Sequence, residues 1–243
     1  MTKSKAKPKD NITVAFTEMA PRYEETVNKE LQAFWGWSYD SFIKTMVKEI
    51  PLEDGDRVLD IATGTAVIPL ALAENGKVGT RLNGLDITPA MLFRAQEKIT
   101  EKKLRSRISL VCASAMGLPY ADSAFDRVVS GLATHHLDIN EMMGEIYRVL
   151  KIGGSLTLGD VGGAEYWKIP GMKLLLRIFA LVYYLIHENI NRAWTEAIAI
   201  ANVFTTEDWR EKVIERGFQS VNIIQLKSRK FWAPDPIIIK AIK

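Results

Sequence analysis

The chain has 243 residues, of which 47% are hydrophobic and one is a cysteine. This length and composition predict one globular domain with a full core, and the single cysteine excludes an internal disulfide framework and favours a reducing, cytoplasmic compartment. The net charge of +3 lies in the first ten residues, which hold four lysines and one aspartate, so the rest of the chain is neutral. The charge balance therefore gives no reason to expect a nucleic-acid partner.

Residues 1–12 are predicted to form a disordered basic tail, because they are rich in lysine and lack the apolar core of a signal peptide. Residues 13–243 are predicted to form a single domain, with a helical cap over about residues 13–50. The longest apolar run, residues 174–186, is too short to span a bilayer and contains Arg177.

Strands and helices are predicted to alternate along the middle of the chain. Strands are expected at residues 57–62, 81–86, 107–112, 125–130 and 155–159, and helices at residues 67–74, 89–101 and 140–150. Thr88 followed by Pro89 is typical of a helix start, and Ile152–Gly154 is expected to end a helix. Alternating units of this kind predict an α/β fold with a doubly wound, mostly parallel sheet and helices on both faces.

The segment "VLDIATGTA" places Asp60 inside an apolar strand and follows it with small residues only. Ala62, Thr63 and Gly64 would form a thin turn at the carboxyl end of the strand, where ligands bind in such sheets. The glycine pattern of a dinucleotide site is absent, and an acidic residue before the turn suits a ligand with a cationic end. Asp86 ends the next strand. Each carboxylate could instead cap nearby backbone N–H groups.

Four segments in this order resemble the class I S-adenosylmethionine-dependent methyltransferases: "VLDIATGTA", "GLDIT", "CASAMGLPYADSAFDRVVSGLATHHL" and "EIYRVLKIGGSLTLGD". The resemblance starts at about Phe16 and implies a seven-stranded Rossmann-like sheet that binds S-adenosylmethionine. It implies that the turn holds the methionine end, that Asp86 binds the ribose and that Ile87 lies against the adenine. Ala66 stands where glycine is usual, which the turn tolerates if φ there is negative. The cofactor-binding residues implied are Asp60, Ala62, Thr63, Gly64, Asp86, Ile87, Ser114, Ala115 and Ser130.

Within this family, "FTEMAPRYEETVN" resembles the ubiquinone/menaquinone-type C-methyltransferases, which implies that Tyr23 lies over the cofactor. A phenol, hydroxyl or carbon acid usually needs a base, and His135 and His187 are the candidates. His136 is expected to pack or to cap the next helix. Cys112 is expected to be a buried structural thiol, and no metal site is expected.

Residues 161–203 are predicted to be an apolar helical lid over the site. Its aromatic residues, together with Trp35 from the cap, are expected to line the acceptor pocket: Phe179, Tyr183 and Tyr184. An amphipathic face with Lys173 and Arg177 could also rest on a membrane surface.

These features predict methyl transfer to a small apolar acceptor, by C- or O-methylation of a quinol, terpenoid or polyketide-like compound. N-methylation of a small amine, a non-catalytic cofactor-binding partner subunit and a nicotinamide dehydrogenase are the alternatives. The acceptor, the atom methylated and the oligomeric state stay open.

Overall fold

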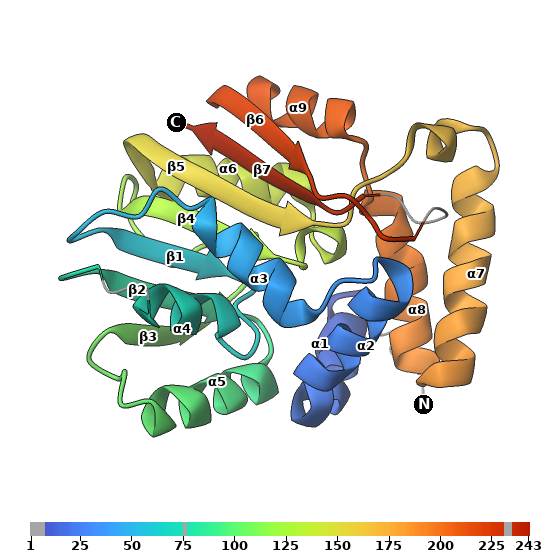
Figure 1. Ribbon diagram of the computed structural model, residues 1–243, viewed down its shortest axis with the longest axis horizontal. Helices are drawn as coiled ribbons and strands as arrows, with labels where there is room; N and C mark the ends of the chain where they lie inside the picture. Colours follow the sequence, from blue (N-terminus) through green and yellow to red (C-terminus); the bar gives the residue numbers. More distant parts are fainter. Residues whose placement is uncertain (1–7, 75–76, 231–234) are drawn as a thin grey trace, which may run out of the picture.

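A twisted sheet with the strand order β3-β2-β1-β4-β5-β7-β6 forms the centre of the molecule (Figure 1). The computed structural model describes residues 8–74, 77–230 and 235–243, with side chains from Ile12 onward. The first five strands are parallel, and β7 runs antiparallel to both β5 and β6. The seven strands are β1 (Arg57–Ile61), β2 (Arg81–Asp86), β3 (Ile108–Cys112), β4 (Phe125–Gly131), β5 (Leu150–Asp160), β6 (Gln219–Gln225) and β7 (Ile237–Ile242). The predicted doubly wound fold is confirmed.

Helices cover both faces of the sheet and bury two apolar clusters against it. The first cluster contains residues of α3 (Tyr39–Lys48), α4 (Val67–Glu74) and α5 (Pro89–Glu101). The second contains residues of α6 (Ile139–Val149) and α9 (Thr206–Glu215). The central strands β1 and β4 are therefore buried over most of their length, at residues 58–61 of β1 and 128–130 of β4.

The ends of these helices follow from local sequence. Asp138 caps α6 by accepting from the N–H groups of Asn140 and Glu141, and Thr205 forms a capping box with Asp208 at the start of α9. α5 begins at Pro89 as predicted, although the Thr88 side chain makes no capping bond.

The prediction that residues 152–154 end a helix is wrong. α6 ends at Val149, and β5 begins at the next residue. The pairing of β4 with β5 shifts between Phe125 and Arg127, so that residues 151–154, including Gly153 with φ +75°, form an irregular start to β5.

Two helical segments lie beyond the carboxyl ends of the parallel strands (Figure 1). The first, the cap, comprises α1 (Pro8–Met19), the short 3₁₀ helix η1 (Ala20–Arg22) and α2 (Tyr23–Phe34). The second, the lid, comprises η3 (Glu165–Lys168), α7 (Met172–His187), α8 (Ile190–Ala199) and η4 (Ile200–Asn202). The predicted disordered tail is too long, because α1 starts at Pro8; residues 1–7 lie outside the described residues. In the described part of the chain, no helix has the length and apolar character needed to cross a membrane.

Candidate active site

Two adjoining cavities lie between the strand ends, the cap and the lid. The larger measures about 280 Å³ and is lined mostly by apolar and aromatic side chains, whereas the smaller measures about 60 Å³. Both are lined by Phe16, Tyr23, Leu132 and His136, which form the wall between them. A group held in one cavity therefore lies close to a group held in the other, beside these four side chains.

The smaller cavity contains four of the predicted cofactor residues. Ala62 and Gly64 come from the turn after β1, and Asp86 and Ile87 come from the end of β2. Parallel pairing of β1 with β2 brings these two strand ends together. Tyr23 covers the turn from the cap, because a Cβ built on Gly64 would lie 3.8 Å from the Tyr23 ring.

The turn after β1 has an unusual backbone. Ala62, Gly64 and Ala66 all have positive φ, of 54°, 53° and 61°. The expectation that Ala66 has a negative φ is therefore wrong. An alanine in this region is strained, and strain of this kind is concentrated at ligand-binding sites.

Asp60 lies directly behind this turn and is buried. One of its carboxylate oxygens, Oδ2, accepts from the Thr63 hydroxyl at 2.6 Å, whereas Oδ1 is buried without a hydrogen-bond partner. Burial raises the pKa of Asp60 to about 8, although the bond from Thr63 lowers it and the Asp86 carboxylate adds to the rise. An unsatisfied buried acceptor at this position fits the cationic methionine end of S-adenosylmethionine.

Asp86 is held by backbone donors on both oxygens. Oδ2 accepts from the Gly64 N–H at 2.9 Å, and Oδ1 accepts from the Thr88 N–H at 2.8 Å. Each oxygen keeps a second lone pair, so the carboxylate can still accept from the hydroxyls of a ribose in the cavity.

The remaining predicted cofactor residues do not line either cavity: Asp60, Thr63, Ser114, Ala115 and Ser130. The Ser114 hydroxyl accepts from the Met116 N–H, and Ala115 is buried in the second apolar cluster. Ser130 is fully buried in β4, where its hydroxyl donates to the Ile61 carbonyl, so this hydroxyl is committed to the sheet. The prediction of a buried Cys112 is wrong: the thiol is exposed, because it ends the edge strand β3.

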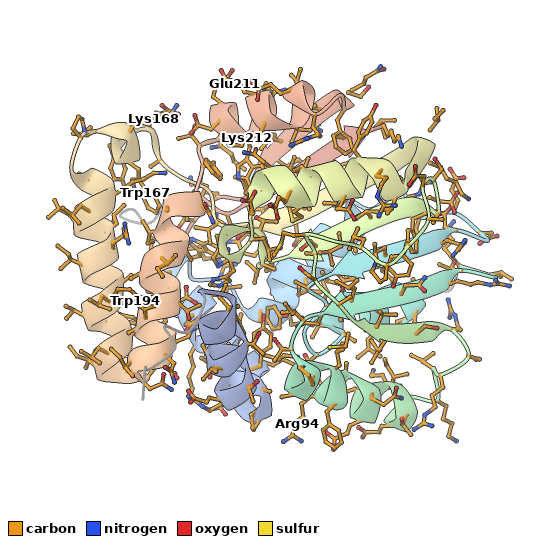
Figure 2. All side chains as sticks on the ribbon, turned by 180° about the vertical axis from the view of Figure 1, so that it is seen from behind. Arg94, Trp167, Lys168, Trp194, Glu211 and Lys212 are labelled. Atoms are coloured by element: carbon orange, nitrogen blue, oxygen red, sulfur yellow. The ribbon has the colours of Figure 1, made fainter. Side chains whose placement is uncertain are left out.

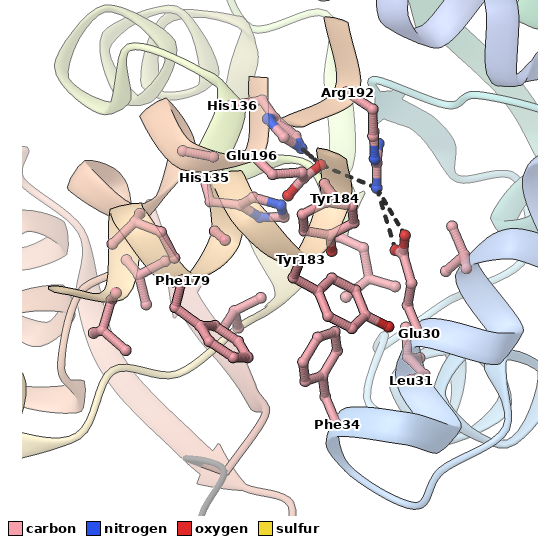
Figure 3. A pocket seen from close by; sticks show the side chains of 18 of the residues that line it. Glu30, Leu31, Phe34, His135, His136, Phe179, Tyr183, Tyr184, Arg192 and Glu196 are labelled. Carbon is pink, nitrogen blue, oxygen red and sulfur yellow. Dashed lines mark hydrogen bonds and ion pairs between the residues drawn. The ribbon is translucent and has the colours of Figure 1, made fainter. Parts of the chain in front are cut away.

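The larger cavity contains the predicted acceptor residues. Trp35 reaches it from the end of α2, and Phe179, Tyr183 and Tyr184 reach it from α7 (Figure 3). Tyr183 packs against Phe34 at 5.3 Å and Phe179 at 6.1 Å between ring centroids. The cap and the lid thus meet through aromatic contacts along this cavity.

His135 lines the larger cavity, and its ring is fixed by Asp160, the last residue of β5. Its Nδ1 lies 2.6 Å from Asp160 Oδ1, and Asp160 also accepts from the Thr134 hydroxyl. This bond leaves Nε2 as the nitrogen available to another partner. Burial alone would lower the pKa of His135, but the charge and hydrogen bond of Asp160 outweigh it and raise that pKa above its ordinary value.

A buried charged cluster closes the same cavity. Arg192 on α8 bonds to Glu30 of the cap and lies 3.0 Å from Glu196, and Glu196 lies 3.5 Å from Nε2 of His136 (Figure 3). Burial raises the pKa of Glu30 to about 7, against the opposing charge of Arg192. His135, His136 and Glu196 bring possible metal ligands within 4.8 Å of one another, but the Arg192 guanidinium already neutralises the Glu196 carboxylate and disfavours a metal ion there.

His187 does not reach either cavity. It is exposed at the end of α7, where its ring stacks on Tyr183 and its Nδ1 lies 2.8 Å from the Tyr183 carbonyl oxygen. This position gives no support to its predicted role as a base. His136 packs edge-on against Phe16 in the wall between the cavities, in keeping with the packing role expected of it.

Reasoning from the sequence missed Asp160 and the Arg192 cluster. Asp160 ends a strand beside the site, as Asp60 and Asp86 nearly do, so the same argument applied to "TLGD" would have found it. Glu30 lies on the cap and Arg192 on the lid, far apart in the chain, and no local pattern indicates their contact.

The comparisons with known proteins agree with this geometry. Residues 59–158 match the family model described as a methyltransferase domain. A demethylmenaquinone methyltransferase of Lactobacillus johnsonii is 28% identical over 90% of this chain and 89% of its own, and one of Listeria monocytogenes is 30% identical over 74% of this chain and 71% of its own. A solved S-adenosylmethionine-dependent methyltransferase from Aquifex aeolicus shares the fold, with a TM-score of 0.60 at 15% identity over 98% of this chain and 99% of its own.

The chain belongs to the class I S-adenosylmethionine-dependent methyltransferases. Within that class it is similar to the demethylmenaquinone methyltransferases named above, and it is an enzyme that uses S-adenosylmethionine. The predicted family, fold and cofactor are confirmed. These findings favour the methyltransferase interpretation over the two alternatives, a non-catalytic subunit and a nicotinamide dehydrogenase.

Proposed function

We propose that the enzyme transfers a methyl group to a carbon of a quinol whose apolar body fills the larger cavity. The observation that carries the proposal is the apolar and aromatic lining of a cavity of about 280 Å³, with His135 among its lining residues. The names of the curated relatives support a quinone-like acceptor. The single cysteine is compatible with work in the reducing cytoplasm.

The cavity wall sets the geometry of the transfer. S-adenosylmethionine supplies a methyl group already activated by its sulfonium centre, so the protein chiefly aligns the acceptor and excludes water. Ala62, Gly64 and Asp86 would hold the cofactor in the smaller cavity. Tyr23 stands in the shared wall, where its ring face suits a neighbouring sulfonium cation.

His135 is placed to act as the general base. Its Nε2 would take the proton of a quinol hydroxyl, which raises electron density at the adjacent ring carbon. That carbon forms the new bond to the methyl group as the methyl–sulfur bond breaks. It then loses its own hydrogen as a proton to water, and the ring oxygen takes back the proton held by His135 as the aromatic ring is restored. Asp160 would fix the orientation of the imidazole ring and stabilise its cationic form, as a buried carboxylate does for a histidine base.

A methyl-transfer screen tests this function. The enzyme is incubated with S-adenosylmethionine carrying a labelled methyl group and with quinols, phenols, prenylated compounds and amines, and products are identified by mass spectrometry and NMR. Label on a ring carbon of a quinol is expected. Label only on an amine nitrogen would contradict the proposal.

Two variants show whether the larger cavity holds the acceptor. Tyr183→Ala removes a cavity aromatic that is far from the cofactor residues, and we expect a higher acceptor KM with S-adenosylhomocysteine affinity nearly unchanged. Phe93→Ala, at an exposed position on α5, is the matched control. Equal losses of acceptor and cofactor binding in Tyr183→Ala would show that the residue serves packing alone.

A further inference from the structure

The outward face of α7 is apolar along its whole length. α7 lies at the outer edge of the molecule, and side chains along its outer side point away from the protein (Figures 1 and 2). Seven large apolar residues of this helix are 49% to 72% exposed: Leu174, Leu175, Ile178, Phe179, Val182, Leu185 and Ile186. At 3.6 residues per turn they cover an arc of about 140° that contains no charged side chain.

The apolar surface extends beyond α7. Ile190, Trp194 and Ile198 form an exposed row at every fourth residue of α8, which packs against α7, and Tyr166 and Ile169 precede α7. We call these residues and the seven of α7 the outer apolar face. Twelve of the eighteen large apolar side chains that are exposed in the described residues belong to it. Contiguous exposed patches of this kind mark interaction surfaces.

The outer apolar face adjoins the acceptor cavity. Tyr166 and Phe179 line that cavity and are also exposed on the surface, at 46% and 58%. The cavity therefore opens on this face. Whatever covers the face also controls how an acceptor enters.

We propose that the outer apolar face docks on an anionic lipid bilayer, from which the acceptor passes into the cavity; this rests on the proposed apolar acceptor. A bilayer would cover the apolar side chains and supply the acceptor at the cavity mouth, whereas a second copy of the chain would cover that mouth. Arg177 is exposed on α7 beside the apolar arc and, in the described part of the chain, makes no ion pair. Lys168 and Lys173 near the start of this helix already have partners, because Lys168 pairs with Glu165 and Asp208 and the Lys173 Nζ donates to the Ala201 and Val203 carbonyl oxygens. Arg177 is therefore the basic residue of α7 that can attract an anionic headgroup.

Vesicle binding tests the docking. The probe is vesicles of phosphatidylcholine with phosphatidylglycerol, and the variant is Ile178→Glu/Val182→Glu, whose two positions lie outside both cavities. Ile152→Glu, at an apolar position 90% exposed on the sheet, is the matched control. We expect the wild type and Ile152→Glu to bind the vesicles with similar affinity. The affinity of the double variant should be lower by a factor of about ten or more.

Activity separates this inference from the proposed function. The double variant should lose turnover of a prenylated quinol embedded in vesicles and keep turnover of a short-chain quinol in solution. Absence of wild-type binding to vesicles, or equal binding by the double variant, would overturn the docking. A wild-type dimer that the double variant converts to a monomer would assign the face to a protein interface and would also overturn it.

Discussion

At the scale of single residues, three carboxylates lie at or next to the carboxyl ends of parallel strands. Asp60, Asp86 and Asp160 come from β1, β2 and β5, and each is buried. Their partners differ: Asp86 accepts from backbone N–H groups, Asp160 supports His135, and Asp60 keeps one oxygen without a partner. In the proposed reaction, Asp86 would orient a ribose, Asp160 a base and Asp60 a cationic group.

The pH dependence of methyl transfer tests the pairing of His135 with Asp160. A base works only when deprotonated, so the rate should rise with pH through a midpoint above about 6.5, the ordinary histidine value. In Asp160→Asn the charge that raises the His135 pKa is lost and burial then lowers it. The acidic limb should shift to lower pH while kcat falls.

Two further variants serve as comparisons for the pH profile. His135→Ala should lower kcat by about 10²–10⁴-fold with cofactor affinity largely kept. His187→Ala should leave the profile as in the wild type, because this ring is exposed on α7. An acidic limb that stays in place in Asp160→Asn would mean that another group titrates.

The affinity for S-adenosylhomocysteine should also depend on pH. With a pKa of about 8, Asp60 is mostly protonated at neutral pH in the free protein, and pairing with a cationic amino group favours its ionised form. Binding should release a proton below pH 8, so that affinity rises with pH and levels off above the pKa. Calorimetry in buffers of different ionisation enthalpy measures this release, and Asp60→Asn should abolish it.

At the scale of elements, Arg192 joins the cap to the lid. Its guanidinium bonds to Glu30 on α2, lies beside Glu196 on α8, and sits 5.3 Å from the Phe16 ring and 5.4 Å from the Tyr184 ring. Buried charges persist only when paired, so this cluster fixes how the two helical segments meet over the acceptor cavity.

Removing Arg192 should therefore destabilise the protein. Arg192→Ala leaves two buried carboxylates without their partner, and we expect the free energy of unfolding to fall by about 3–5 kcal/mol. Arg177→Ala, at an exposed position, should change it by less than about 0.5 kcal/mol. Chemical denaturation measures both, and a loss below about 1 kcal/mol in Arg192→Ala would show that the cluster is not a stabilising link.

The elements were more predictable than their contacts. Alternating apolar runs and turn residues predict the parallel strands and their helices, because burial on both faces and helix capping act locally. The apolar length of residues 172–187 predicts a helix, but not that its apolar side faces outward, because burial depends on how α8 and the cap pack beneath it. Two other features likewise depend on tertiary structure. Cys112 is exposed because it lies on an edge strand, and Ala66 has a positive φ in a turn that is bonded to Asp86 through the Gly64 N–H.

At the scale of the whole molecule, the sheet, cap and lid place two cavities on either side of one wall. In the proposed function, the strand ends and the segments that follow them supply the cofactor residues and the base, the cap supplies Tyr23 and part of the aromatic lining, and the lid supplies the rest of that lining. The larger cavity is thus formed jointly by three parts of the chain, and no single segment forms it alone. Methyl transfer requires both cavities to be filled at once.

A crystal structure with S-adenosylhomocysteine and a quinol analogue bound together tests this arrangement most directly. We predict the cofactor against the Ala62–Gly64 turn and Asp86, and the analogue in the larger cavity, with one of its oxygens about 2.6–3.2 Å from Nε2 of His135. The sulfur should face the quinol ring beside Tyr23, with no side chain between the sulfur and the ring carbon that is methylated. An analogue bound outside the larger cavity, or bound there without contact to His135, would contradict the account.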